Sequence, residues 1–497
     1  MKNACIILAT LSVGLAVWAQ SPLTFYRNLL LSPADPTAVC CWGFGSVSTV
    51  YGISDPSSGS TATQVTVTAS DGSPYIRQQM VVPSNATYAL QVTAKAGTGS
   101  WVELSLSDYS ANSYTGWCNL TTGTTGSTRS IGLLTAISVN ISSLGGGWYT
   151  CTVTGSTGTL TGQYGGQYFY DLRIPNADLT DSGTSGQMID IWHPQIFFGS
   201  TAYAWGTTVP TKKFTYFGFE GDPANRYRAA QSDDGITWYG YNGVWYPPFQ
   251  RNAPQVFIYN KTYYLHIANA SDGDLDNHLW QIGQVTPDGT VTTIATIDWA
   301  SKISGVDSCF SGGPILDAGV QYIMIPCSIG DWHHSLAYLT HMVGGDPTQW
   351  SDPQLVTTDL TTGSYDFKPR KIGAYYYMWS SREGGAGGLD LSKASSLAGP
   401  YTAVTPSSIR AFPSLNIEGP TMFSTGPSSW RLIFEQLQTA SPGHKLWYSD
   451  CNTFYPDACT WTAPAAVVED QLYRHGSIIP TPGWAMFPMP GAVATNR

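Results

Sequence analysis

The stretch Ile417-Glu418-Gly419-Pro420-Thr421-Met422-Phe423 is followed, after a short turn, by Trp430-Arg431-Leu432-Ile433-Phe434. A polar or acidic residue, a small residue and a proline lead into an apolar strand, and an aromatic-rich strand returns. The same pattern occurs four more times, anchored at Pro254, Pro314, Pro369 and Ser477. With Pro420 included, the anchors are 60, 55, 51 and 57 residues apart. Strand repeats of that length predict the blades of a β-propeller.

The two ends of this repeat region complement one another. Residues 214–219, 227–232 and 236–239 predict the outer strands of a blade, whereas residues 475–487 predict an innermost strand without outer ones. Together they make one blade, and four complete blades start near residues 252, 307, 366 and 418. The sequence therefore predicts a five-bladed ring, whose closure removes open sheet edges.

The residues before this ring follow a different pattern. Residues 20–200 are rich in Ser, Thr and Gly, and polar and apolar residues alternate over 64–69, 88–95, 101–106, 147–153 and 188–192. Strands of period two between turn clusters predict a β-sandwich. We therefore expect an all-β chain with a signal peptide at 1–19, a jelly-roll sandwich at 20–200, a linker at 201–212 and a five-bladed β-propeller at 213–497.

The N-terminus indicates an exported protein, and the charge indicates which partners to exclude. Lys2 and the apolar residues after it predict a secretion signal, so an extracellular or periplasmic location is expected. No later stretch is apolar over about 18 residues, so no membrane anchor is expected. The net charge is −10 and only 11% of the residues are charged, which argues against a nucleic-acid partner.

Export also permits disulfide bonds. Eight cysteines follow the predicted signal, and six of them suggest three pairs. Cys118 and Cys151 are expected in neighbouring strands of the sandwich, Cys309 and Cys327 flank adjacent strands of one repeat, and Cys451 and Cys459 flank a short loop. Cys40 and Cys41 are adjacent and stay unassigned. Because the sequence has no CxxC motif and no His-Cys cluster, the cysteines predict no metal site.

The residues that precede each innermost strand are predicted to lie at the mouth of the propeller channel. Two places before the anchors stand Asn252, Gly312, Phe367, Glu418 and His475. Three places before them stand Arg251, Ser311, Asp366, Ile417 and Arg474. A carboxylate pair at such a mouth suits hydrolysis of a glycosidic bond. One carboxylic acid protonates the leaving oxygen, and another carboxylate activates water or stabilises the cation-like transition state.

Three phrases of this region resemble glycoside hydrolase family 43 and its five-bladed relatives: "LDLSKASSLAGPY" at 389–401, "IEGPTMF" at 417–423 and "RHGSIIPTPG" at 474–483. The resemblance spans roughly residues 214–490. It implies an inverting enzyme in which Glu418 is the general acid, Asp366 tunes that acid and orients the sugar, and His475 lies at the channel centre. It requires no cofactor, and it is compatible with a calcium ion or a water molecule near His475.

The sandwich carries a second resemblance. The phrases at 88–108, 145–155 and 188–200 are similar to carbohydrate-binding-like jelly rolls found beside glycosidases and in phage fibre proteins. This resemblance implies a module that either binds sugar or packs as a structural support. The sequence leaves both alternatives open.

The first complete blade departs from the family pattern, because Ala253 stands where the family has the general-base Asp. Asp307, which leads into the next inner strand, is our substitute candidate for the base, and Asp222 is a weaker one. Further substrate contacts are expected from Arg251, Asn252, Arg474 and His475, and from a loop with Trp332 and His333.

The sequence therefore predicts a secreted glycoside hydrolase that acts on arabinose-, xylose- or galactose-type bonds in polysaccharide. The alternative is a non-catalytic glycan-binding protein or adhesin, which the missing Asp at Ala253 favours. A sialidase-type enzyme needs an arginine triad and a tyrosine nucleophile. Arginines are present, but the carboxylate phrases fit that class less well.

Overall fold

The computed structural model describes the chain in segments. These are residues 25–26, 42–70, 73–81, 85–108, 112–158, 167–204, 208–209, 213–219, 227–240, 252–260, 262–268, 279–285, 291–310, 312–329, 335–359, 364–382, 388–410, 412, 416–426, 428–437, 444–469 and 474–480. The predicted signal peptide at 1–19 and the pair Cys40 and Cys41 lie outside the described residues.

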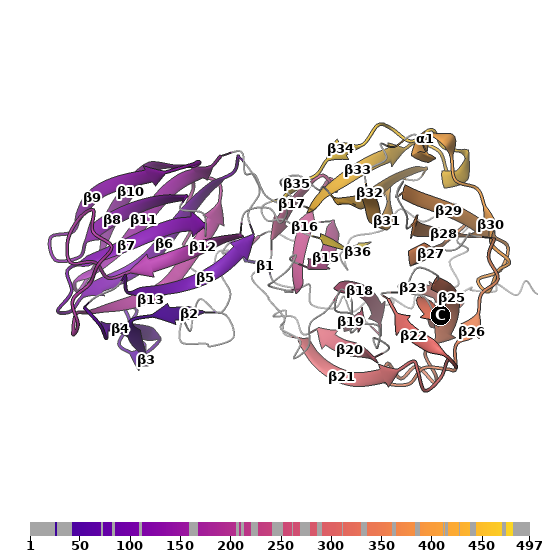
Figure 1. Cartoon of the computed structure of the whole chain (residues 1–497), viewed down its shortest axis with the longest axis horizontal. Coiled ribbons are helices and arrows are strands. Elements are labelled where there is room, and N and C mark those ends of the chain that lie inside the picture. The colour runs from indigo at the N-terminus through magenta and orange to yellow at the C-terminus, as the bar shows by residue number, and fades with distance from the viewer. Residues whose placement is uncertain are drawn as a thin grey trace, which may run out of the picture.

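Two six-stranded antiparallel sheets form the N-terminal part (Figure 1). The first sheet runs β10 (Leu134–Gly145), β11 (Trp148–Thr157), β6 (Thr87–Ala96), β13 (Met188–Phe198), β4 (Ala62–Val67) and β3 (Val47–Ile53). The second runs β2 (Gly43–Gly45), β5 (Tyr75–Val81), β12 (Gln167–Arg173), β7 (Trp101–Asp108), β8 (Ser113–Asn119) and β9 (Thr124–Ile131). A short ribbon joins β1 (Phe25–Tyr26) to β14 (Thr208–Val209).

The strand order confirms the predicted jelly roll. When β4 to β8 and β11 to β13 are numbered from one to eight along the chain, the central sheets read 1-8-3-6 and 2-7-4-5. This is the double-sheet order of a jelly roll. Alternate residues such as Val102, Leu104 and Leu106 pack between the sheets, so the period-two pattern of the sequence places one face of each strand in the core.

Five sheets follow and close into a ring (Figure 1). Blade I contains β15 (Phe214–Phe219), β16 (Tyr227–Ser232) and β17 (Thr237–Gly240), with β36 (Arg474–Pro480) innermost and β35 (Val468–Glu469) outermost. Blade II contains β18 (Asn252–Tyr259), β19 (Thr262–Ala268), β20 (Leu279–Val285) and β21 (Val291–Asp298). The antiparallel pairing of β36 with β15 confirms that both ends of the propeller sequence build one blade.

The remaining blades are continuous in sequence. Blade III contains β22 (Val306–Cys309), β23 (Gly313–Asp317), β24 (Val320–Ile329), β25 (Ser335–His341) and β26 (Gln354–Leu355). Blade IV contains β27 (Ser364–Ile372), β28 (Tyr375–Arg382), β29 (Gly388–Ala394) and β30 (Thr402–Ala403). Blade V contains β31 (Asn416–Gly426), β32 (Ser429–Leu437), β33 (His444–Cys451) and β34 (Ala465–Ala466). The helix α1 (Ser407–Arg410) and the 3-10 turn η1 (Pro456–Ala458) are the helical elements of the described residues.

All three expected disulfides are present. Cys309–Cys327 joins β22 to β24 within blade III, and Cys451–Cys459 closes a short loop in blade V. Cys118 and Cys151 differ from the expectation of neighbouring strands, because β8 and β11 belong to different sheets. Their bond therefore crosses the core and ties the two layers of the sandwich together.

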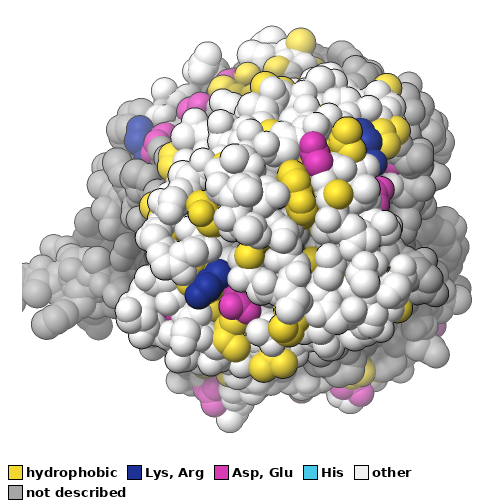
Figure 2. Space-filling model, turned by 90° about the vertical axis from the view of Figure 1, so that its left-hand side faces the viewer, with side chains coloured by type: hydrophobic (Ala, Val, Ile, Leu, Met, Phe, Trp, Pro, Cys, Tyr) yellow, Lys and Arg dark blue, Asp and Glu magenta, His cyan; other side chains and the backbone are white. Residues whose placement is uncertain are grey.

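The surface of the sandwich that points away from the propeller carries few charged side chains (Figure 2). Its hydrophobic side chains lie in small separate groups on this face. Among the described residues, no helix is long and apolar enough to cross a membrane.

Candidate active site

Each innermost strand of the propeller carries one extra residue at the end where the sequence predicted the channel mouth. On β31, three steps from Glu418 to Thr421 face two steps on β32. The same one-residue excess occurs in β27 between Tyr365 and Lys368. It also occurs in β18 at 252–255, in β36 at 474–477 and between β22 and β23 at 309–313. Such β-bulges bend a strand and redirect its side chains, and they are common beside active sites.

The bulges give a register that differs from the one set by the prolines. Asn252, Tyr365, Glu418 and Arg474 each form the last regular pair before a bulge. The residues that follow them, and that occupy the first bulge position, are Ala253, Asp366, Gly419 and His475. Asp366 is therefore the structural counterpart of Gly419 and His475, and Glu418 is the counterpart of Tyr365 and Arg474.

Glu418 and Asp366 come together at the junction of β27 and β31. The Tyr365 hydroxyl donates to Glu418 Oε2 over 3.2 Å. One oxygen of Asp366, Oδ2, accepts from the Ser381 hydroxyl at 3.0 Å and from the Gly419 N–H at 3.1 Å. The Gly419 N–H also lies 2.9 Å from Ser381 Oγ. Asp366 thus holds the peptide group that directly follows Glu418, and both carboxylates are buried, at 3% and 8% exposure.

The backbone of Asp366 is strained. Its φ is +55°, close to the +63° of its counterpart Gly419 in blade V. Glycine adopts this left-handed conformation freely, whereas a residue with a Cβ pays on the order of 1–3 kcal/mol. An aspartate at a bulge position suited to glycine is the kind of local violation that concentrates at functional sites.

Two basic side chains with buried nitrogen atoms lie in this part of the ring, Lys368 near Asp366 and His266 near Lys368. Burial lowers the pKa of Lys368 to about 8, and the nearby negative charge of Asp366 opposes this shift. Burial, together with the positive charge of Lys368, lowers the pKa of His266 well below its usual value. Among the described residues, Lys368 Nζ and both ring nitrogens of His266 have no hydrogen-bond partner. At neutral pH the imidazole of His266 is therefore uncharged, and the ammonium of Lys368 loses its proton more readily than an exposed lysine does.

Sequence reasoning missed a second glutamate. Glu435 in β32 is the direct cross-strand partner of Glu418 and is fully buried. Opposite residues of antiparallel strands have Cβ atoms roughly 4.5–5.5 Å apart on the same face, so the two side chains leave the sheet side by side. The sequence held a clue to this pair, because Glu418 and Glu435 lie about equally far along the chain from the predicted hairpin turn. Finding it required the strand register, including its two irregularities.

The other predicted site residues divide into two groups. Asp307 lies half-buried in β22 at the bulge end of blade III, and the backbones of Asn252, Arg474 and His475 lie at the bulges of β18 and β36. Residues Asp222, Arg251, Trp332 and His333 lie outside the described residues. Over the described parts of the chain, no three His, Cys, Asp or Glu side chains group as metal ligands.

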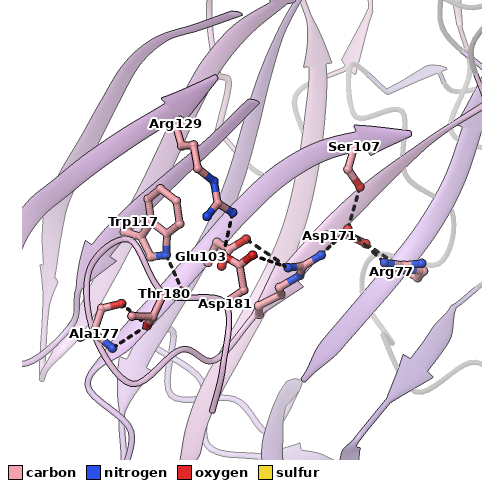
Figure 3. Close-up of polar contacts among 10 residues, drawn as sticks. Arg77, Glu103, Ser107, Trp117, Arg129, Asp171, Ala177, Thr180 and Asp181 are labelled. Carbon is pink, nitrogen blue, oxygen red and sulfur yellow. Dashed lines mark hydrogen bonds and ion pairs between the residues drawn. The ribbon is translucent and has the colours of Figure 1, made fainter. Parts of the chain in front are cut away.

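A separate polar cluster covers the outer face of the second sandwich sheet (Figure 3). Asp171 is fully buried and accepts two hydrogen bonds from Arg77, at 2.9 and 3.2 Å, and one from Ser107 at 2.8 Å. Arg173 lies 3.3 Å from Asp171 and 3.8 Å from Glu103. Burial raises the pKa of Glu103 to about 8, although Arg173 partly offsets this effect.

No protein-family model matches the chain, and no curated protein matches it. Solved structures do match. Among them are the following glycoside hydrolases. An endo-1,4-beta-xylanase from Bacteroides thetaiotaomicron is 13% identical over 52% of this chain and 93% of its own, with a TM-score of 0.40. A thermostable family-43 glycoside hydrolase is 15% identical over 52% of this chain and 96% of its own, with a TM-score of 0.36. An endo-arabinase from Bacteroides thetaiotaomicron is 17% identical over 55% and 90%, with a TM-score of 0.35. Similarity at this level transfers neither substrate nor catalytic residues to this chain.

Proposed function

We propose that this chain is a secreted glycoside hydrolase that cleaves arabinose-, xylose- or galactose-type bonds in polysaccharide with inversion. The observation that carries this proposal is the junction of β27 and β31. There the buried carboxylate of Glu418 adjoins a peptide group that the strained Asp366 holds. We further propose that residues 20–200 and 213–497 are separate domains.

Glu418 is the proposed general acid. It gives its proton to the glycosidic oxygen as the bond from that oxygen to the anomeric carbon breaks. Tyr365 steadies the acid through its hydroxyl, and Asp366 fixes the backbone beside it. Both are positioning residues, because a small displacement of an acid from the bond it protonates costs up to about 100-fold in rate.

Inversion also needs a base that takes a proton from the water attacking the opposite face of the sugar. We propose Asp307 for this role, because it is a half-buried carboxylate at the bulge end of blade III. Glu435 suits the role less, because it is fully buried. An Asp307→Asn chain should then lose activity to about the same degree as a Glu418→Gln chain, and unchanged turnover excludes Asp307.

We propose that Asn252, Arg474 and His475 contact the sugar, since all three occupy the bulge end of inner strands. Arg251, Trp332 and His333 remain proposed contacts on sequence grounds. Three disulfides accord with export.

The test is release of reducing sugar from arabinan, xylan and galactan by the full chain. A Glu418→Gln chain purified in the same way is the control for contaminating enzymes. Release by the wild type alone supports the proposal. The configuration of the first product, read by NMR, tests inversion. No release from any of the three polymers refutes the proposal.

One observation favours a second candidate, a glycan-binding protein without hydrolytic activity. Ala253 occupies the bulge position that Asp366 and His475 occupy in other blades, so blade II offers no carboxylate there. Binding of a polymer without release of sugar identifies this function.

A further inference from the structure

A pocket of about 500 Å³ lies where the segment that links blade IV to blade V packs against blade V. The helix α1, which Figure 1 shows at the outer rim of the ring, contributes to one wall. The strands β31, β32 and β33 form another. We call this the interblade pocket and define it by its lining residues: Ser408, Phe412, Ile417, Phe434, Gln436, Trp447, Trp461, Thr462, Ala463 and Pro464.

The lining is neutral and amphipathic. None of these residues carries a charge, so the pocket suits neither a phosphate nor a carboxylate ligand. Aromatic rings of Phe412, Phe434, Trp447 and Trp461 supply flat apolar walls, while Ser408, Gln436 and Thr462 supply hydroxyl and amide groups. Its volume is in the range of roughly 300–1,000 Å³ that is usual for small-ligand sites. A ligand with apolar faces and several hydroxyl groups matches this surface, and sugars are such ligands.

One polar atom in this wall lacks a partner. The indole Nε1 of Trp447 is buried and has no hydrogen-bond acceptor among the described residues. The other pocket tryptophan is satisfied, because Trp461 Nε1 donates to the Pro456 carbonyl over 3.2 Å. A buried donor without an acceptor is costly by about 1–3 kcal/mol. This nitrogen is shielded from solvent, so the Trp447 ring has to turn for its N–H to reach a ligand hydroxyl, and that hydrogen bond removes this cost.

The interblade pocket adjoins the proposed acid along the same two strands. Ile417 and Gln436 are cross-strand partners, one step from the pair Glu418 and Glu435. One step along a strand is about 3.3 Å, and successive side chains point to opposite faces of the sheet. The pocket and Glu418 are thus separate sites at the same end of blade V.

We propose that the interblade pocket binds a neutral sugar residue of the glycan, one other than the residue at the bond to be cleaved. The indole of Trp447 donates to a sugar hydroxyl, and the aromatic walls contact its CH faces. The choice of a sugar as ligand rests on the proposed function. Binding in the pocket does not require hydrolysis.

The test uses the full chain with Glu418→Gln as the parent, titrated calorimetrically with arabino-, xylo- and galacto-hexaose. Trp447→Phe keeps a ring and removes the N–H, and Gln436→Ala removes an amide. Each is expected to raise Kd about fivefold, the value of one hydrogen bond. Trp238→Phe is the matched control, because its buried indole nitrogen also lacks a partner among the described residues but lies outside the pocket.

The proposal is overturned if no hexaose binds the parent, if both pocket variants bind as the parent does, or if Trp238→Phe weakens binding equally. Thermal melts show whether each variant is folded. Trp447-dependent binding by a chain whose wild type releases no sugar refutes the proposed hydrolysis and supports the pocket.

Discussion

Two buried aspartates, one in each part of the molecule, are held in different ways. In the sandwich, Asp171 accepts from Arg77, Arg173 and Ser107 (Figure 3). In the propeller, Asp366 accepts from the neutral Ser381 hydroxyl and Gly419 N–H, and its backbone is strained. The ion pairs of Asp171 offset the free-energy cost of burying its charge. Asp366 instead has neutral hydrogen-bond donors, with the buried ammonium of Lys368 nearby.

We propose that this difference separates a structural carboxylate, Asp171, from a functional one, Asp366. Arginines on both sides fix Asp171 and complete its bonding, so it stabilises the sheet. Asp366 occupies a bulge position where glycine is easier, and its bonds orient the peptide next to Glu418. The sandwich cluster should therefore respond to mutation in stability, and the propeller pair in activity.

The largest expected effect is on the stability of the sandwich. Asp171→Asn removes one side of a buried charge network, and breaking such a pair costs about 3–5 kcal/mol. Urea unfolding of the full chain should show an earlier transition for the sandwich. Asp190→Asn is the control, because Asp190 is only part-buried and accepts one 3.3 Å bond from Gln64. If both variants unfold at the same urea concentration, the structural role assigned to Asp171 is wrong.

The next effect is the pH dependence of the same cluster. The pKa of Glu103 is raised from 4.5 to about 8, so the folded chain binds a proton that the unfolded chain has released between these values. The free energy of unfolding should therefore fall as pH rises from about 5 to about 8, by at most about 1.4 kcal/mol per pH unit. Glu103→Gln should flatten this slope in urea titrations. If the slope persists in that variant, another titrating group causes it.

A smaller effect, on activity, is expected at Asp366. Asn and Asp adopt the left-handed conformation with similar ease, so Asp366→Asn keeps the bulge while removing the charge. We expect kcat/KM to fall about 100-fold, or about 2.7 kcal/mol, because Glu418 loses its fixed position. Steady-state kinetics on the best polymer measure this, with thermal melts as a check on folding. A variant with wild-type kcat/KM makes Asp366 structural, like Asp171.

The smallest effect concerns Lys368. Its pKa of about 8 means that it loses its charge beside Asp366 just above neutral pH. We expect kcat/KM to fall several-fold above pH 8 in the wild type. Lys368→Met should remove this limb from the pH profile. An unchanged limb in that variant excludes Lys368 as its source.

The sequence predicted the architecture more completely than the site. The spacing of the anchors and the half-blades at both ends were enough to predict five blades, because blades that follow one another along the chain are neighbours in the ring. The site depends on which residues pair across neighbouring strands, and a pattern along the sequence does not show this pairing. Tyr365, Ser381 and Glu435 join the site because of cross-strand pairing and bulges. The proline anchors misaligned the blades, because Pro420 lies within its bulge whereas Pro369 pairs regularly with the next strand. The cross-sheet bond of Cys118 and Cys151 likewise needed the stacking of the two layers.

The most direct test of the central claim compares two substrates of one Glu418→Gln chain. A general acid is needed for a sugar leaving group but not for dinitrophenolate, which leaves without a proton. The account predicts that this variant loses about 10²–10⁴-fold in kcat/KM on the oligosaccharide that the wild type cleaves, and far less on its dinitrophenyl glycoside. An equal loss on both substrates, or none on the oligosaccharide, contradicts the role of Glu418 as the acid.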